Sequence, residues 1–383
     1  MLLTKGFEVE VYTGTPDGEV VGLSDRIVRD LSGFVREPDS RNVEYTTAPF
    51  CRYERLLCEL VQPRLRLRKY LKTLGQYTLI PGSTLSLGGS DRFQRSDPNN
   101  PYHDYIEHTY GTSVVTASIH INIGIDDPEV LMRACRLVRV EAPLYLALSA
   151  SSPFLDGEPT GHHSTRWYTF PKTPAHVPLF ENHRHYIDWT AEQLAVGTMQ
   201  NVRHLWDSVR PNGDRRPYQL NRLELRICDL VTDPVSLLAI TALLETRITQ
   251  VIANPDLDPL QLSSLPKASR ADDLVALTNQ NELAAAHSSL DAALRHWQDG
   301  RSLSARDWIQ ELYQQVWPTA KAQGIGCFLL PVQSILKRGN EAQQWLSHYG
   351  QTQNTPTVLQ QSIEEMIQQE QMLEDQLCQQ LVA

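Results

Sequence analysis

The residues best suited to chemistry are acidic side chains that recur, with one histidine and one arginine, at alternate positions of four short stretches. Two of the acidic residues are separated by a single residue, and the others are far apart in the chain. Carboxylate oxygens in this number, together with one imidazole, suit Mg²⁺ or Mn²⁺ better than Zn²⁺. The candidate metal ligands are Glu8, Glu10, Glu44, His120 and Glu224, and Arg226 follows two residues after the last of them.

Polar and apolar residues alternate in each of these stretches, which is the pattern of a half-buried β-strand. Side chains of a strand point alternately to its two faces, so the candidate ligands would lie opposite a buried apolar face. If the four strands share one sheet, the ligands converge, and Glu10 lies on the same face as His120. Carboxylates crowded in this way raise each other's pKa unless cations separate them. The four stretches are residues 6–12, 41–47, 116–123 and 222–228.

Four unrelated strands with solvated polar faces are the alternative interpretation. For any one stretch this alternative is favoured, because alternation alone is typical of ordinary half-buried strands. Four stretches that all carry ligand chemistry on the polar face favour a common site.

The composition is that of a globular protein. The 383 residues are 41% hydrophobic and 21% charged, which allows one large core or two ordinary ones. The net charge of -10 opposes extended contact with a phosphate backbone, so we expect no nucleic-acid partner. The six cysteines lack CxxC spacing, and neither a signal peptide nor a membrane span is evident, so we expect a cytoplasmic protein.

The segments between the strands predict helices and one long loop. A helix is expected over 52–60 and is expected to end at Pro63. The polar stretch 81–110 is expected to be a loop near the site, and residues 190–209 are expected to form a helix.

The last third of the sequence is predicted to be mostly helical. We expect residues 1–330 to form a catalytic domain and residues 331–383 to form a helical extension packed on the same domain. The final predicted helix, 357–381, carries an apolar stripe that could also contact a second subunit, so a monomer and a homodimer both remain open.

Five motifs in this order resemble those of the glutamate–cysteine ligase family of carboxylate–amine ligases, and the match looks closest to its cyanobacterial branch. Each motif is short, so the specificity lies in the combination, which covers about the first two-thirds of the chain. The motifs are FEVE at 7–10, VEYTTAP at 43–49, SIHIN at 118–122, WDSVRP at 206–211 and LELRICD at 223–229.

The resemblance implies an α+β fold: a glutamine-synthetase-like antiparallel sheet curved into a funnel, with helices on its outer side and a helical C-terminal tail. It also implies that the five candidate ligands hold Mg²⁺ against the phosphates of ATP and that Arg226 is catalytic, facing the transferred phosphoryl group. Further ATP or substrate contacts are implied at Asn122, Arg166, Trp167 and Arg210.

The implied reaction joins the γ-carboxylate of L-glutamate to the amine of L-cysteine, with ATP as co-substrate, and is the first step of glutathione biosynthesis. Because a free carboxylate is a poor electrophile, the reaction would pass through a γ-glutamyl phosphate. The residues do not identify the base that deprotonates the amine. For Arg166, a surface arginine without a substrate is an equally open interpretation.

Two rival functions remain open from the sequence. A carboxylate–amine ligase with a different amine acceptor would need the same metal and phosphate residues, because acceptor choice depends on a few pocket contacts. A non-catalytic protein that binds a metal or nucleotide, or an assembly protein that uses its C-terminal helix, is the other. Arg226 beside Glu224 argues against a metal store, which has no need for a cation among its ligands.

Overall fold

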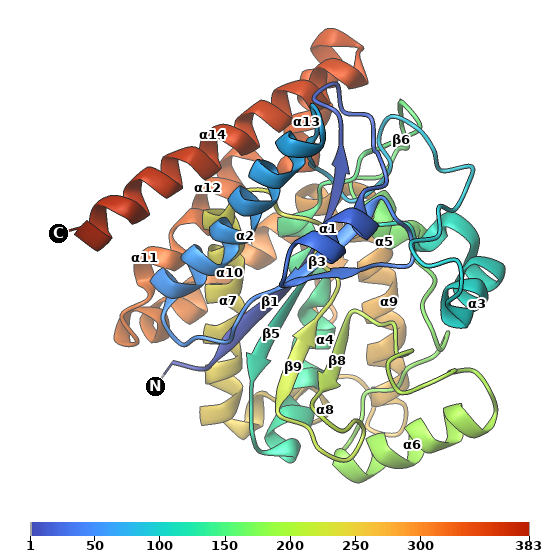
Figure 1. The fold of residues 1–383 in the computed structure, drawn as a ribbon. Helices are drawn as coiled ribbons and strands as arrows, with labels where there is room; N and C mark the ends of the chain where they lie inside the picture. The colour runs from blue at the N-terminus through green and yellow to red at the C-terminus, as the bar shows by residue number, and fades with distance from the viewer. Residues whose placement is uncertain (1, 383) are drawn as a thin grey trace.

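A twisted antiparallel sheet lies at the centre of the molecule (Figure 1). The computed structural model describes residues 2–382, with side chains described through residue 376. The strand order is β2-β3-β1-β5-β9-β8, and β4 pairs with the C-terminal end of β1. The strands are β1 (Lys5–Gly14), β2 (Phe34–Arg36), β3 (Asn42–Thr46), β4 (Thr78–Ile80), β5 (Ile119–Gly124), β8 (Val209–Asn212) and β9 (Arg222–Leu225).

The four strands predicted from alternation are β1, β3, β5 and β9, and they are neighbours in the sheet. On β1, Phe7, Val9 and Val11 are buried in the main hydrophobic core. Burial of each such side chain contributes about 1.5–3 kcal/mol, which fixes the face that the strand turns inward. The predicted α+β fold with a central antiparallel sheet is confirmed, and in the described residues the sheet stays open and does not close into a barrel.

Three long helices cover the apolar side of the sheet: α2 (Tyr53–Leu74), α4 (Pro128–Ser149) and α7 (Pro234–Ala253). α4 packs on β8 and β9, α2 packs on β4, and α7 packs against both of these helices. Asp127 and Asp233 cap the N-termini of α4 and α7 by accepting main-chain N–H groups, and a proline follows each cap. Asp-Pro is a favourable helix start because proline lacks only an N–H that the first turn leaves unpaired.

α7 is the one helix in residues 2–382 that is long and apolar enough to cross a membrane. Its most apolar window is 72% buried inside the protein. A helix that is apolar on all sides and buried on most of them is typical of a protein core.

Shorter elements surround this core. They are α1 (Ser24–Asp30), α3 (Pro101–Tyr110), β6 (Phe154–Leu155), β7 (Glu158–Pro159), α5 (Thr165–Thr169), α6 (His183–Ala195), α8 (Pro259–Leu262), α9 (Arg270–Ser288), β10 (Ala293–Arg295), β11 (Ser302–Ser304), α10 (Ala305–Ala322), α11 (Gly326–Leu329), α12 (Pro331–Arg338), α13 (Glu341–Thr352) and α14 (Thr355–Val382).

Pro63 does not end its helix, contrary to the prediction from sequence. α2 continues through it to Leu74 because the buried residues Leu56, Leu60 and Leu67 lie on one side of a single long helix. The stabilisation from packing this apolar stripe outweighs the cost of the main-chain hydrogen bond that is lost at proline.

The predicted loop over 81–110 and the predicted helix over 190–209 were each wrong in part. Residues 101–110 form α3, in which the Asn100 side chain accepts the N–H of Tyr102 and Pro101 occupies the first turn. Helix α6 begins at His183 and ends at Ala195, well before the predicted end at residue 209, which is the first residue of the edge strand β8. Pro211 is tolerated there because an edge strand leaves one side of its backbone unpaired.

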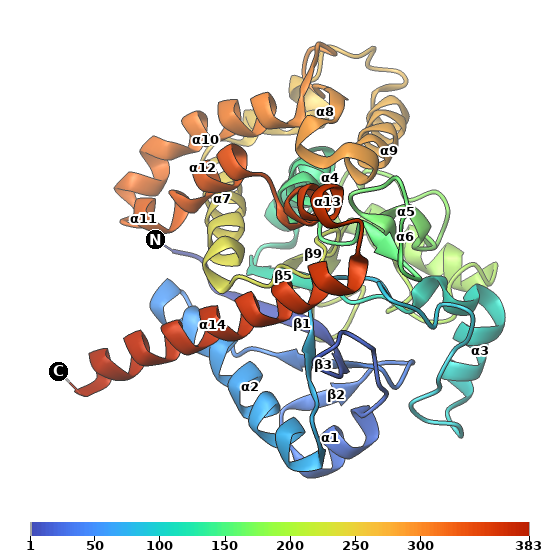
Figure 2. The same cartoon turned by 90° about the horizontal axis from the view of Figure 1, so that it is seen from above.

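The C-terminal helix α14 crosses the outer surface of α2 (Figure 2). Its residues Ile363 and Met366 join the main hydrophobic core. Arg68 of α2 forms a buried ion pair with Glu370 of α14 and also donates a hydrogen bond to Thr78. The expected stripe position Leu377 lies outside the described side chains. The division of the chain at residue 330 stays a prediction.

Substitution Glu370→Ala should lower the free energy of unfolding by about 3–5 kcal/mol, because it leaves the buried guanidinium of Arg68 without its charge partner. Urea unfolding followed by circular dichroism measures this loss. Glu364→Ala, at an exposed position of the same helix, is the matched control and should change stability by less than about 0.5 kcal/mol. Equal stabilities for the two variants would show that the pair does not hold α14 in place.

Candidate active site

The polar face of the sheet brings the predicted ligands together through cross-strand pairing. Glu8 lies directly opposite His120 on β5, and Glu10 lies opposite Glu44 on β3. Glu224 of β9 lies between Asn122 on one side and Arg210 on the other. His120 Nε2 is 3.9 Å from Glu10 Oε1, so these two residues share a face as expected.

One group of candidate ligands consists of Glu8, His120 and Glu224, whose ligand atoms lie within 4.8 Å of one another. His120 Nδ1 is 2.9 Å from Glu8 Oε2 and 3.5 Å from Glu224 Oε1. Burial and the charge of Glu224 act to raise the pKa of Glu8, but the hydrogen bond and charge of His120, with Arg226, outweigh them and lower it.

A second group consists of Glu10, Glu37 and Glu44, also within 4.8 Å of one another. Ser118 Oγ donates a hydrogen bond of 2.7 Å to Glu10 Oε2. Glu37 follows the three-residue strand β2 and was missed by the sequence analysis. A strand this short shows no readable alternation, so only its position shortly before Glu44 could have drawn attention to it.

In the second group, Glu37 and Glu44 form no ion pair with any described residue, and their ionised forms are disfavoured. Burial raises the pKa of Glu44 to about 8, and the nearby Glu8, Glu10 and Glu224 add to this shift. Burial, with the charges of Glu10 and Glu44, raises the pKa of Glu37 well above its usual range. Three converging carboxylates that lack a cation fit a divalent ion with oxygen ligands, such as Mg²⁺.

Glu224 differs from the other carboxylates because arginines surround it. Arg210 donates to both of its oxygens at 2.7 and 3.0 Å, and Arg226 Nη1 donates to Oε1. Burial acts to raise the pKa of Glu224, but Arg210, Arg226 and His120 hold it well below the usual range. Glu224 therefore anchors two guanidinium groups, a contact that the sequence did not reveal.

A cavity of about 420 Å³ opens over this face. Glu10, Glu37, Glu44 and His120 line it together with guanidinium groups and aromatic rings from several loops and from α3. The rings are those of Tyr102, Phe170 and Trp206, and the arginines are Arg36, Arg166, Arg203, Arg210 and Arg226.

A second cavity of about 450 Å³ lies at the other end of the polar face. Glu8 lines both cavities, so its carboxylate stands at the boundary between them. Asn122 lines the second cavity and donates a 3.3 Å hydrogen bond to Glu8, while its buried Oδ1 has no partner in the described residues. An unpaired buried oxygen next to a carboxylate is a ready acceptor for a ligand.

Arg166 lies beside Arg226 at the wall of the first cavity. Its Nη2 donates to the carbonyl of Arg226 at 2.9 Å, and its Nη1 donates to the carbonyl of Ile227 at 3.1 Å. The ring of Trp167 packs 5.7 Å from its guanidinium carbon and is buried behind it. Arg166 is thus a buried residue that supports the segment carrying Arg226, and the surface interpretation was wrong.

This geometry predicts that Arg166→Lys lowers kcat, because lysine cannot bond both carbonyls and Arg226 would lose its support. We expect a fall of about 10²-fold, with the KM for the substrate changing less than threefold. Steady-state kinetics with the wild-type protein as reference measures both constants. If KM rises and kcat is kept, Arg166 instead binds a substrate carboxylate directly.

Comparisons with known proteins agree with this site. A sequence model of the glutamate–cysteine ligase family 2 matches residues 4–372. A provisionally named glutamate–cysteine ligase 2-1 of Rubrobacter xylanophilus is 26% identical over 344 residues, covering 87% of this chain and 85% of the relative. A provisionally named glutamate–cysteine ligase 2 of Sorangium cellulosum is 29% identical over 249 residues, covering 64% and 63% of the two chains.

Solved structures show the same fold. The glutamate–cysteine ligase of Francisella tularensis in complex with AMP superposes with a TM-score of 0.74 at 13% identity, covering 99% of this chain and 93% of that one. A bifunctional glutathione synthetase from Pasteurella multocida gives 0.73 at 14% identity, and the match covers 96% of this chain and 53% of that longer one. The family resemblance predicted from the motifs is confirmed, and the chain belongs to glutamate–cysteine ligase family 2.

Proposed function

We propose that this carboxylate–amine ligase joins the γ-carboxylate of L-glutamate to the amine of L-cysteine through a γ-glutamyl phosphate, at the expense of ATP. The observation that carries the proposal is the convergence of the carboxyl groups of Glu10, Glu37 and Glu44 in one cavity with Arg226. Negative phosphates need cations on both sides during transfer, and this arrangement offers a cation site and a guanidinium.

Mg²⁺, or Mn²⁺ in its place, would be held by Glu10, Glu37 and Glu44, with Glu8, His120 and Glu224 as a second set of ligands. Bound there, the cation would neutralise charge on the phosphates of ATP. The second set is weaker as a metal site, because Glu224 is already neutralised by Arg210 and Arg226.

In the first step an oxygen of the γ-carboxylate attacks the γ-phosphorus of ATP. The bond from this phosphorus to the bridging oxygen breaks, and ADP leaves with the electron pair. Arg226 would donate hydrogen bonds to the transferring group, because one Nη holds Glu224 and its other N–H groups remain. Glu224 and Arg166 fix its position from two directions.

In the second step the cysteine nitrogen, after loss of a proton, attacks the acyl carbon. The carbon–oxygen bond to phosphate breaks, and inorganic phosphate leaves as the amide forms. The rings of Tyr102, Phe170 and Trp206 at the cavity wall would limit access of water, which would otherwise hydrolyse the acyl phosphate.

Two adjoining cavities suit a reaction with three substrates. We place the two amino acids in the arginine-rich cavity of about 420 Å³ and the nucleotide in the cavity of about 450 Å³. Its γ-phosphate would lie at the boundary near Glu8, where cations held by the two sets of ligands would separate it from the carboxylates. AMP in the Francisella tularensis ligase supports a nucleotide in this fold. The cyanobacterial type, a cytoplasmic location, a monomeric or dimeric state and a place at the start of glutathione synthesis stay predictions.

The decisive experiment measures ADP release with ATP, Mg²⁺, L-glutamate and one amine at a time: cysteine, alanine, serine, 2-aminobutyrate or glycine. We expect cysteine to give the highest kcat/KM, and γ-glutamylcysteine to appear in equal amount to ADP. Turnover with another amine that equals or exceeds the cysteine rate would assign a different acceptor. Absence of glutamate-dependent ADP release with every amine would contradict the ligase proposal.

A further inference from the structure

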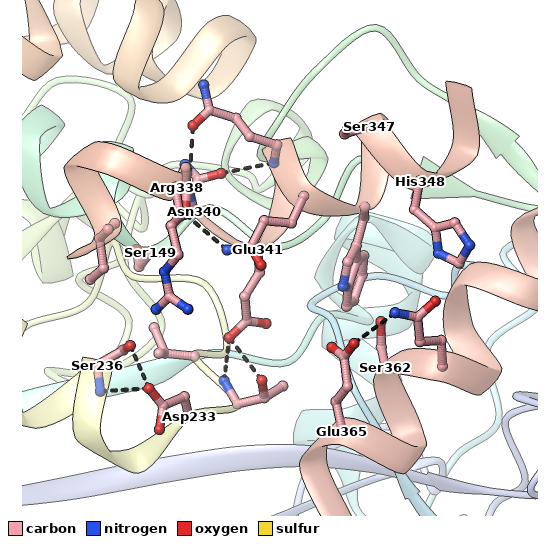
Figure 3. Close-up of a pocket in the computed structure, with 18 of the residues that line it drawn as sticks. Ser149, Asp233, Ser236, Arg338, Asn340, Glu341, Ser347, His348, Ser362 and Glu365 are labelled. Atoms are coloured by element: carbon pink, nitrogen blue, oxygen red, sulfur yellow. Dashed lines mark hydrogen bonds between the residues drawn. The ribbon is translucent and has the colours of Figure 1, made fainter. Parts of the chain in front are cut away.

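A third cavity, of about 560 Å³, lies on the side of the molecule formed by the C-terminal helices (Figure 3). It is lined by α12, α13 and α14, by the end of α4 and by residues 231–236, which follow β9 and Arg226 in the chain. It shares no lining residue with the two cavities of the active site. Its volume lies in the range of small-molecule sites.

Two side chains of opposite charge line this cavity, and each has polar atoms that no described residue pairs. Arg338, the last residue of α12, is exposed to solvent, and its guanidinium makes neither a hydrogen bond nor an ion pair with the described part of the chain. Glu341 Oε1 accepts hydrogen bonds from the N–H and Oγ1 of Thr232 at 2.7 and 2.8 Å, whereas Glu341 Oε2 is buried and unpaired. Both side chains point into the cavity in Figure 3.

The unpaired oxygen is costly for the protein alone. Burial raises the pKa of Glu341 to about 7, even though both hydrogen bonds from Thr232 act to lower it. A buried acceptor without a donor destabilises the folded protein, so a ligand that supplies an N–H group would relieve this cost.

The rest of the wall is mainly polar. Asn340, Ser347 and His348 come from α13 and the residue before it, and Ser362 and Glu365 come from α14. A polar cavity of this size favours a hydrophilic ligand over an apolar one.

We propose that this cavity binds a small zwitterion, an α-amino acid or a short peptide, with its carboxylate on Arg338 and its ammonium on Glu341. A simple anion would satisfy Arg338 but would face the carboxylates of Glu341 and Glu365 without pairing them. A simple cation would pair Glu341 but would gain nothing from the solvated guanidinium of Arg338 and would be repelled by it. A ligand with both charges pairs both groups, and the guanidinium can hold a carboxylate through two hydrogen bonds.

The inference rests on the contacts of this cavity and not on the reaction proposed above, so it is tested by binding without ATP. Calorimetry would titrate the wild-type protein with each of the twenty common amino acids, glycylglycine and triglycine, and with acetate and methylammonium as singly charged controls. We expect at least one zwitterion to bind more tightly than both controls. Arg338→Gln should weaken that binding at least tenfold.

Two further variants test whether zwitterion binding depends on this cavity or only on the net charge of the nearby surface. Glu341→Gln keeps an oxygen acceptor for Thr232 but loses the negative charge, so it should also weaken the zwitterion at least tenfold. Lys337→Gln removes a neighbouring exposed charge that does not line the cavity and should bind as the wild type does. Binding that is equal in wild type and Arg338→Gln for every zwitterion, or acetate binding as tight as the best zwitterion, would overturn the proposal.

Discussion

Replacement of Arg226 by glutamine should lower kcat by about 10³-fold, the largest loss we expect from a single side chain. A guanidinium at the transferring phosphoryl group stabilises charge that is greatest in the transition state, so its removal affects kcat more than KM. The fold should survive, because Glu224 keeps Arg210 and the 2.6 Å hydrogen bond from Asn212.

Single-turnover formation of ADP, compared with steady-state turnover, measures this effect on the chemical step. Arg226→Lys, which keeps the charge but not the planar donor group, should recover only part of the rate. Arg215→Gln, at an exposed position in the turn before β9, is the matched control and should retain the wild-type rate. A rate for Arg226→Gln within tenfold of wild type would remove Arg226 from the reaction.

The second large effect concerns Glu44 and has opposite signs for activity and stability. Glu44→Gln should lower kcat/KM by about 10³-fold, because it removes a metal ligand. The same change should make the metal-free protein more stable at pH 8, by about 1–3 kcal/mol, because it removes a buried negative charge next to Glu10 and Glu37.

The pH dependence follows from the raised pKa of Glu44. The unfolded carboxyl ionises near its ordinary value of 4.5 and the folded one near 8, so the folded state holds an extra proton between these values. Stability of the wild type is therefore lost as pH rises through this window, and the Gln variant should lose less. Urea unfolding in EDTA at pH 6 and pH 8 measures the difference.

The same unfolding measurement with Mg²⁺ in place of EDTA tests whether Glu44 binds the cation. Mg²⁺ should stabilise the wild type at pH 8 and stabilise Glu44→Gln much less, since binding to the native state alone raises its stability. Glu19→Gln, which removes an exposed carboxyl, should respond to pH and Mg²⁺ as the wild type does. An equal Mg²⁺ response in wild type and Glu44→Gln would place the cation elsewhere.

Strand alternation predicted most of the polar face, because a period of two assigns every residue of a strand to a side. It placed Glu8, Glu10, Glu44 and His120 together although they are separated by up to 112 residues. What alternation cannot report is which strands are neighbours. That information came from the combination of motifs, and the structure supplied the register.

The residues that sequence reasoning missed lie where local pattern is weak or is outweighed by packing. Glu37 follows a strand of three residues, and the four-residue strand β8, which carries Arg210, was not predicted as a strand although Arg210 itself was a predicted contact. Helix α3 did carry a signal, Asn100 followed by Pro101, inside a stretch whose polarity favoured a loop. The role of Glu224 as the partner of two arginines depends on contacts that no spacing encodes.

Glu8 stands between two cavities, and this has a kinetic consequence for the order of events. If nucleotide and amino acids occupy separate chambers that touch only at the reacting phosphorus, spent ADP can depart while the dipeptide is still bound. ADP would then compete with ATP alone, whereas the dipeptide would compete with glutamate, so product-inhibition patterns would reveal two independent exits.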